Sequence, residues 1–131
     1  ELDRYYREVW GEHVHHGLWR TGRETPEEAV EALTAFVAER AAVRRGNRVC
    51  DIGSGYGGSA RLVAKHFHAR VMALTIVPAQ YEFAVATGPP GNPQYLLRDW
   101  LENGLPDQSF DAAYAIESTE HMANKARAFA E

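Results

Sequence analysis

The ten residues VCDIGSGYGG, from Val49 to Gly58, constrain the fold of this chain more than any other stretch. An apolar run that ends in closely spaced glycines is typical of a buried strand that turns tightly into a helix. Gly53, Gly55 and Gly58 fit the G-x-G-x-x-G pattern of turns that bind nucleotides. The turn therefore predicts a nucleotide-type ligand beside a strand end, and the remaining sequence must indicate which one.

The chain around this turn alternates short apolar strands with helices. A capping box from Thr25 to Glu28, with proline at position 26, predicts where the first helix begins. We expect helices at residues 26–42, 59–67, 78–86 and 122–130, and strands at residues 48–52, 71–76, 94–98 and 112–116. This alternation predicts an α/β fold, a Rossmann-like parallel sheet with helices on both faces.

Polar residues stand near the end of each predicted strand: Asp51, Thr75, Asp99 and Glu117. In an open α/β sheet the ligand lies outside the carboxyl ends of the strands, where the strand order reverses. We therefore expect these side chains to share one crevice with the glycine turn.

Two cofactor classes compete for this crevice. A dinucleotide site expects an acidic residue roughly 20 residues after the turn, whereas this chain has Thr75 at that strand end. Asp51 stands just before the first glycine, where a pyrophosphate needs no negative charge. S-adenosylmethionine carries a sulfonium and an ammonium but no phosphate, so an acid beside the turn suits it. The sequence favours S-adenosylmethionine and leaves a nicotinamide dinucleotide enzyme as the less favoured alternative.

Composition excludes several other classes. The 131 residues are 45% hydrophobic and 24% charged, as expected for one globular unit. The net charge is −4, without a cluster of Lys or Arg, so we expect no nucleic-acid partner. No apolar run is long enough to cross a bilayer. The single cysteine, Cys50, suits a core position in a reducing compartment, and we expect a cytoplasmic protein. Because the numbering begins at Glu1 and not at a methionine, a removed targeting peptide upstream of Glu1 stays an alternative.

Three segments resemble the class I S-adenosylmethionine-dependent methyltransferases. DIGSGYG at residues 51–57 resembles their first motif, LPDQSFD at 105–111 the turn before their fourth strand, and IESTEHM at 116–122 the segment after it. WGEHVHHGLW at 10–19 resembles the lead-in of the branch that contains tocopherol, sterol and natural-product methyltransferases. The resemblance covers the chain from about Tyr5 to Phe129.

The resemblance implies methyl transfer from S-adenosylmethionine, leaving S-adenosylhomocysteine, to a small, partly apolar acceptor at oxygen, carbon or nitrogen. Thr75 replaces the usual ribose-binding acid, but the tocopherol-like and sterol-like branches share its hydroxyl and the proline and glutamine that follow. Asp99 is an adenine-edge acceptor or a helix cap, and Trp100 a stacking platform or a core residue. The implied cofactor contacts are Asp51, Gly53, Ser54, Gly55, Thr75, Ile76, Gln80, Asp99, Trp100 and Glu117.

Residues 1–24 are expected to form a lid on the acceptor side, and residues 25–131 a partial cofactor-binding domain. His13, His15 and His16 are expected to line the crevice. They lack the Cys partners or the HExxH spacing of zinc ligands, so no metal site is expected. The apolar walls beside them are expected from Tyr5, Tyr6, Trp10 and Trp19.

His121 is the candidate catalytic residue. It lies in a segment that resembles the acceptor-facing wall of the family, where a histidine can take a proton from a hydroxyl that is being methylated. The alternatives are that His121 only begins the final helix, and that alignment of donor and acceptor provides the catalysis.

The family sheet has seven strands, and this sequence supplies the first part of it. The strand at 112–116 would then lack a neighbour, and an unpaired apolar edge predicts self-association. A second hypothesis follows, in which the chain is a cofactor-binding fragment or a non-catalytic module that needs another chain.

Overall fold

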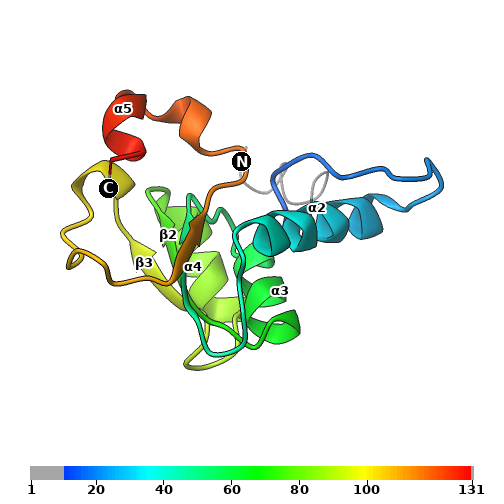
Figure 1. Ribbon diagram of the computed structural model, residues 1–131, viewed down its shortest axis with the longest axis horizontal. Helices are drawn as coiled ribbons and strands as arrows, with labels where there is room; N and C mark the ends of the chain where they lie inside the picture. The colour runs from blue at the N-terminus through cyan, green and yellow to red at the C-terminus, as the bar shows by residue number, and fades with distance from the viewer. Residues whose placement is uncertain (1–10, 131) are drawn as a thin grey trace.

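Four short parallel strands form the centre of the fold in the computed structural model, which describes residues 11–130 (Figure 1). Their order across the sheet is β3-β2-β1-β4. The bounds are β1 Arg48–Ile52, β2 Arg70–Thr75, β3 Gln94–Leu97 and β4 Ala112–Tyr114. The parallel α/β sheet predicted from the sequence is confirmed.

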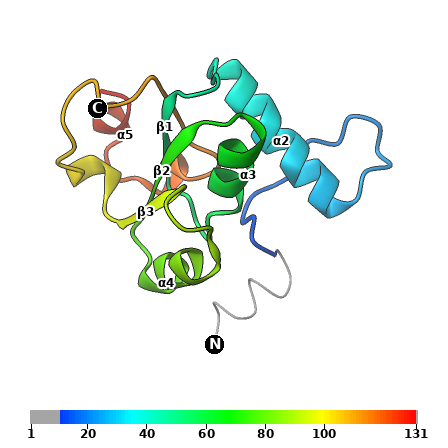
Figure 2. The same ribbon diagram turned by 90° about the horizontal axis from the view of Figure 1, so that it is seen from below.

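Both faces of the sheet are covered. Side chains alternate between the two faces along each strand, so each face carries its own apolar cluster. Val49, Val71 and Tyr114 point into one cluster, which packs against α2 (Pro26–Arg40) and α3 (Gly58–His66). Cys50 and Leu74 point into the other, which is covered by the 3-10 turn η1 (Trp100–Glu102) and by α5 (Lys125–Ala128). Figure 2 shows α2 and α3 together beside the sheet, with α4 (Pro78–Thr87) below β3.

The first helix begins as predicted, with the Thr25 side chain and Glu28 forming a complete capping box. It ends at Arg40, two residues before the predicted end. Ala42 has a φ of 54° and therefore leaves the right-handed helical region. The turn is closed when the Val43 amide donates to the Ala38 carbonyl.

The end of the chain differs most from the sequence prediction. The expected strand at 112–116 stops at Tyr114, because only Ala112 to Tyr114 pair with β1. The helix expected at 122–130 is present only as the single turn α5, which begins at Lys125; a 3-10 turn, η2 (Thr119–His121), and an extended Met122 precede it. The Asn124 side chain accepts from the Arg127 amide, so the polar cap starts the helix later than the apolar pattern suggested.

The strand order decides where a ligand can bind. The chain moves from β1 to β2 to β3 in one direction and then returns to place β4 on the other side of β1. The direction of winding therefore reverses between β1 and β4, and loops leaving these two strands diverge and open a crevice. Among the described residues, no helix has the length and apolar character needed to span a membrane.

Candidate functional site

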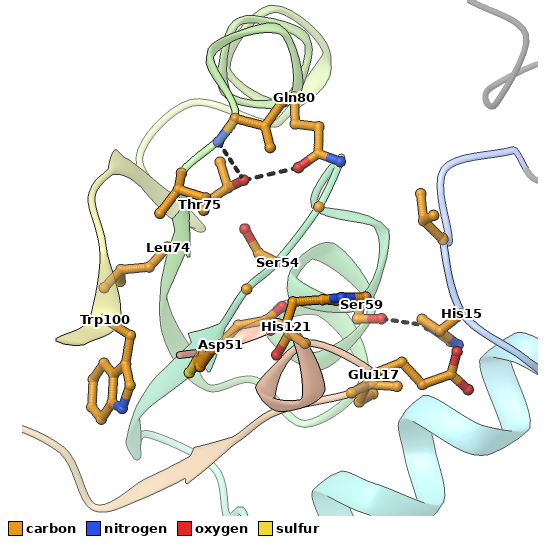
Figure 3. A pocket seen from close by; sticks show the side chains of 18 of the residues that line it. His15, Asp51, Ser54, Ser59, Leu74, Thr75, Gln80, Trp100, Glu117 and His121 are labelled. Atoms are coloured by element: carbon orange, nitrogen blue, oxygen red, sulfur yellow. Dashed lines mark hydrogen bonds between the residues drawn. The ribbon is translucent and has the colours of Figure 1, made fainter. Parts of the chain in front are cut away.

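A cavity of about 520 Å³ opens at the carboxyl ends of the strands (Figure 3). It is lined by loops after β1, β2, β3 and β4 and by the segment before α2. The structure thus brings together every predicted cofactor contact and the candidate catalytic residue, although the roles of these residues stay predictions. They are Asp51, Gly53, Ser54, Gly55, Thr75, Ile76, Gln80, Asp99, Trp100, Glu117 and His121.

The glycines of the turn serve two different purposes. Gly53 has a φ of 77°, and a Cβ there would collide with the side chain of Ser118. Gly55 has a φ of 56°, but a Cβ there would meet nothing within 4 Å. Gly53 therefore lets the turn pack against the loop after β4, whereas Gly55 leaves backbone open toward the cavity, where a ligand can approach it.

Asp51 and Ser54 present unsatisfied polar atoms beside the turn. Asp51 is only 2% exposed, and burial raises the pKa of its carboxyl to about 7, an effect that the nearby Tyr114 hydroxyl opposes. Within residues 11–130, Asp51 Oδ2, Ser54 Oγ and the Tyr114 hydroxyl have no partner in hydrogen-bonding geometry. The Tyr114 hydroxyl is nevertheless near enough to act on the pKa of Asp51, and of the three groups Asp51 and Ser54 line the cavity. Buried polar atoms normally have partners, so this end of the cavity suits a ligand that brings donors and positive charge.

Thr75 and Gln80 form a pair across the start of α4. The Thr75 hydroxyl donates to Gln80 Oε1 over 2.9 Å and accepts from the Val77 amide over 3.3 Å. Because Gln80 Oε1 is engaged, the amide nitrogen of its side chain is left as the available donor. The threonine, proline and glutamine that resemble the tocopherol-like branch therefore have a structural role: the Thr75 hydroxyl orients the Gln80 carboxamide at the cavity (Figure 3).

Asp99 and Trp100 both have structural partners. Asp99 Oδ1 accepts from the Leu101 amide over 2.9 Å and so caps η1. Trp100 is 9% exposed, and its indole nitrogen donates to the Ala128 carbonyl over 2.9 Å. Trp100 therefore belongs to the core cluster with Leu74 and offers the cavity only apolar surface. Trp100 is thus a core residue and Asp99 a helix cap, as one alternative for each residue predicted. Both residues also line the cavity.

The histidines before α2 form one side of the cavity. His15 is 6% exposed; its Nδ1 donates to the His16 carbonyl over 2.8 Å, and its Nε2 lies 3.0 Å from Ser59 Oγ. Burial, and then the neighbouring His15, lowers the pKa of His13 to about 4, so His13 is uncharged at neutral pH. His13 and His15 line the cavity as predicted, whereas His16 contacts Glu117 instead.

Two other predictions for this segment have different outcomes. Trp19 is half exposed and does not belong to the cavity lining, so its predicted part in the apolar wall is wrong. Tyr5, Tyr6 and Trp10 lie outside the described residues. Across residues 11–130, no group of three or more His, Cys, Asp or Glu side chains is arranged to hold a metal ion.

His121 ends η2, is exposed and lines the cavity. Its amide donates to the Ser118 carbonyl over 3.2 Å, which sets the turn on which the imidazole is carried. It does not begin a helix, because α5 starts only at Lys125. The structure thus places His121 beside the cavity, and its catalytic role stays a prediction.

Ser59 and Ser118 are site residues that sequence reasoning missed. Ser59 was counted only as part of a helix, although its place directly after the glycine turn points it toward the cavity. Ser118 donates to the Ile52 carbonyl and joins the loop after β4 to the end of β1. No local sequence pattern indicates that contact, because the two residues meet only through the sheet.

The family follows from comparison with known proteins. A family model described as a methyltransferase domain matches residues 50–131, which is most of the chain. The chain belongs to the class I S-adenosylmethionine-dependent methyltransferases. A probable chloroplastic tocopherol O-methyltransferase from Oryza sativa is 32% identical to this methyltransferase chain over 138 residues, covering 95% of it. A sterol 24-C-methyltransferase from Neurospora crassa is 32% identical over 120 residues, covering 88%.

Solved structures share the fold of this methyltransferase chain. A putative sarcosine dimethylglycine methyltransferase from Galdieria sulphuraria has a TM-score of 0.86 and 28% identity over 97% of the chain. The [4+2]-cyclase SpnF has a TM-score of 0.82 and 28% identity over 97% of the chain, so the fold alone does not determine the reaction. The chain spans 38% of the Oryza protein, 31% of the Neurospora protein and 52% of the Galdieria structure.

Proposed function

We propose that this chain binds S-adenosylmethionine in the cavity and forms the cofactor-binding part of an enzyme that methylates a small, partly apolar molecule. The observation that carries the proposal is the unsatisfied Asp51 carboxylate and Ser54 hydroxyl beside an open glycine turn, in a chain of this family. The cofactor ammonium would offset the charge of Asp51. Its carboxylate would accept hydrogen bonds from Ser54 and from backbone near Gly55.

Further along the cavity, the carboxamide of Gln80, fixed by Thr75, would bind ribose hydroxyls. Ile76 and Trp100 would pack against the adenine, and the second oxygen of Asp99 would accept from its edge. These assignments follow from the order of the residues along the cavity, from the end of β1 to the end of β3.

S-adenosylmethionine, when bound, supplies an electrophilic methyl group on a sulfonium. The contribution of the chain is to hold the acceptor in line and to exclude water from the cavity. For an acceptor hydroxyl, His121 would take the proton through a ring nitrogen, and the proton would leave to solvent because His121 is exposed. For an acceptor without a proton to lose, alignment alone would be sufficient.

Calorimetry and thermal melting test the cofactor directly. S-adenosylhomocysteine is expected to bind saturably and to raise the melting temperature, whereas NAD(H) should do neither. Binding of NAD(H) without binding of S-adenosylhomocysteine would refute the proposal and return the dinucleotide alternative.

A second candidate function is supported by the length of the match. Because the chain spans only 52% of the Galdieria structure, it is also a candidate cofactor-binding module that requires further polypeptide for transfer. Labelled cofactor and a panel of phenols, sterols and amines separate the two: transfer by this chain supports an enzyme, and transfer only by a longer chain supports the module. The cytoplasmic location expected from the sequence stays a prediction.

A further inference from the structure

Residues 12–16, which we call the strap, form one side of the cavity. The Glu12 carboxylate is ion-paired with Arg61 of α3, and two further anchors hold the strap. At the first, the buried His15 contacts Ser59, and Ser59 Oγ lies 3.1 Å from Thr34 Oγ1. The Thr34 hydroxyl in turn donates to the Val30 carbonyl over 3.0 Å. Four polar groups from the strap, α3 and α2 thus satisfy one another in the interior, so this first anchor is rigid.

The second anchor is on the surface and joins the strap to the loop after β4. The Glu117 carboxylate accepts from the His16 amide over 3.1 Å, and its two oxygens lie 3.0 and 2.9 Å from His16 Nδ1. The side chains of His16 and Glu117 are 79% and 35% exposed. Contacts of this kind are weak and exchange readily with water.

The backbone of Glu117 is adapted to this contact. Its φ is 49°, in the left-handed region that a non-glycine residue occupies only at a cost in free energy. This conformation turns the side chain out of the direction of β4 and toward the strap (Figure 3). The contacts that the Glu117 carboxylate makes with His16 offset part of this cost, and a glycine at this position would meet the backbone requirement without the contact.

From this arrangement we infer that Glu117 and His16 are positioning residues that hold the strap closed over the bound cofactor. The inference rests on the proposed function. The strap carries His13 and His15 on one side of the cavity, and the loop after β4 carries Ser118 and His121 on another. A ligand between them contacts both sides and reinforces their junction. The His16–Glu117 contact must therefore open before the ligand leaves, while the buried anchor and the Glu12–Arg61 ion pair keep the strap on α3.

The kinetics of S-adenosylhomocysteine release test this inference. His16→Ala should raise the dissociation rate by about two- to fivefold, the range of an exposed side-chain contact, with the association rate nearly unchanged. His66→Ala is the matched control, because His66 is an exposed histidine at the end of α3 and does not line the cavity. Glu117→Gln, which keeps one acceptor oxygen for the His16 amide, should lie between wild type and His16→Ala.

Glu117→Gly guards against an effect of folding, because glycine accepts the positive φ and relieves the strain. It should retain the melting temperature of the wild type within a few degrees and still release the ligand faster. A dissociation rate unchanged in His16→Ala would overturn the inference whatever the effect of Glu117→Gly, because Glu117 also lines the cavity and is itself a predicted cofactor contact. An equal increase in His66→Ala would overturn it as well.

Amide exchange separates failure of the inference from failure of the proposed function. In the ligand-free chain, Glu117→Gly should accelerate exchange of the His16 amide but not of the Leu18 amide, which donates to the Ala29 carbonyl. If this difference is seen and S-adenosylhomocysteine does not bind, the anchor stands and the proposed function fails. If the ligand binds without slowing exchange of the His16 amide, the cofactor is supported and the coupling is refuted.

Discussion

The affinity of the chain for S-adenosylhomocysteine is expected to rise about tenfold between pH 6 and pH 8 through ionisation of Asp51. With a pKa of about 7 in the ligand-free chain, the carboxyl is about one-tenth ionised at pH 6 and about nine-tenths ionised at pH 8. The ligand ammonium is attracted to the carboxylate and not to the neutral acid. The observed affinity therefore follows the ionised fraction.

Asp51→Asn is the reference for this measurement, because it removes the titrating charge with little change in size. At pH 8 its affinity should be weaker by about ten- to a hundredfold, corresponding to a charged hydrogen bond of about 1.5–3 kcal/mol. Calorimetric titrations of both proteins at pH 6, 7 and 8 separate titration of Asp51 from titration of the ligand amine, which both proteins share. An identical pH dependence of binding in the two proteins would refute the role of Asp51.

The same carboxyl acts in the opposite direction on the stability of the ligand-free chain. Its pKa in the folded chain is raised above the ordinary 3.8. Its stabilising contribution is therefore complete below about pH 4 and is lost as the pH rises to about 7, with a slope of at most about 1.4 kcal/mol per pH unit. Asp51→Asn should lack this slope and unfold at higher denaturant concentration than wild type at pH 8. A less stable Asn variant at pH 8 would show that the ligand-free chain accommodates the carboxylate.

Four further measurements follow from the site and the sheet. Gly53→Ala should destabilise the fold by about 2–4 kcal/mol in denaturant unfolding, through strain and collision with the loop after β4. Gly55→Ala carries the strain of a positive φ without a collision, so it should destabilise the fold less and still weaken ligand binding in calorimetry. Thr75→Ala should weaken binding by only about 0.5–1.5 kcal/mol, the value of one neutral hydrogen bond; a larger loss than in Asp51→Asn would contradict the assignment. In a longer, active chain, His121→Ala should lower turnover of acceptor alcohols by about a hundredfold with S-adenosylhomocysteine affinity unchanged, and full turnover would exclude it as the base. Light scattering should show self-association at high concentration through the edge at Ala112–Tyr114, and a monomer throughout would show that the edge is otherwise protected.

The sequence by itself determined the order and type of most elements. The short run RVCDI at 48–52 predicts β1 with its observed bounds, because Val49, Cys50 and Ile52 suit a buried strand and the glycine turn ends it. The capping box at Thr25 predicts the start of α2, because its hydrogen bonds join residues three positions apart. The polar residues at strand ends predict the cavity, because parallel strands place their carboxyl ends at one edge. Each of these inferences depends either on contacts between residues close in sequence or on an arrangement that all open parallel α/β sheets share.

Only the tertiary structure decided what individual side chains do within that frame. The sequence singles out Asp51 by its place before the glycine turn but not its raised pKa, which arises because residues distant in the chain bury it. Glu117 was expected to face the cofactor, yet its carboxylate contacts His16, 101 positions earlier. The late start of α5 is likewise a tertiary effect. Met122 is extended and packs against core residues of β1 and η1, so the helix begins only after it. Burial and long-range hydrogen bonding come from the whole arrangement of strands and loops, so the pattern around a residue indicates its position at the site without indicating its partner.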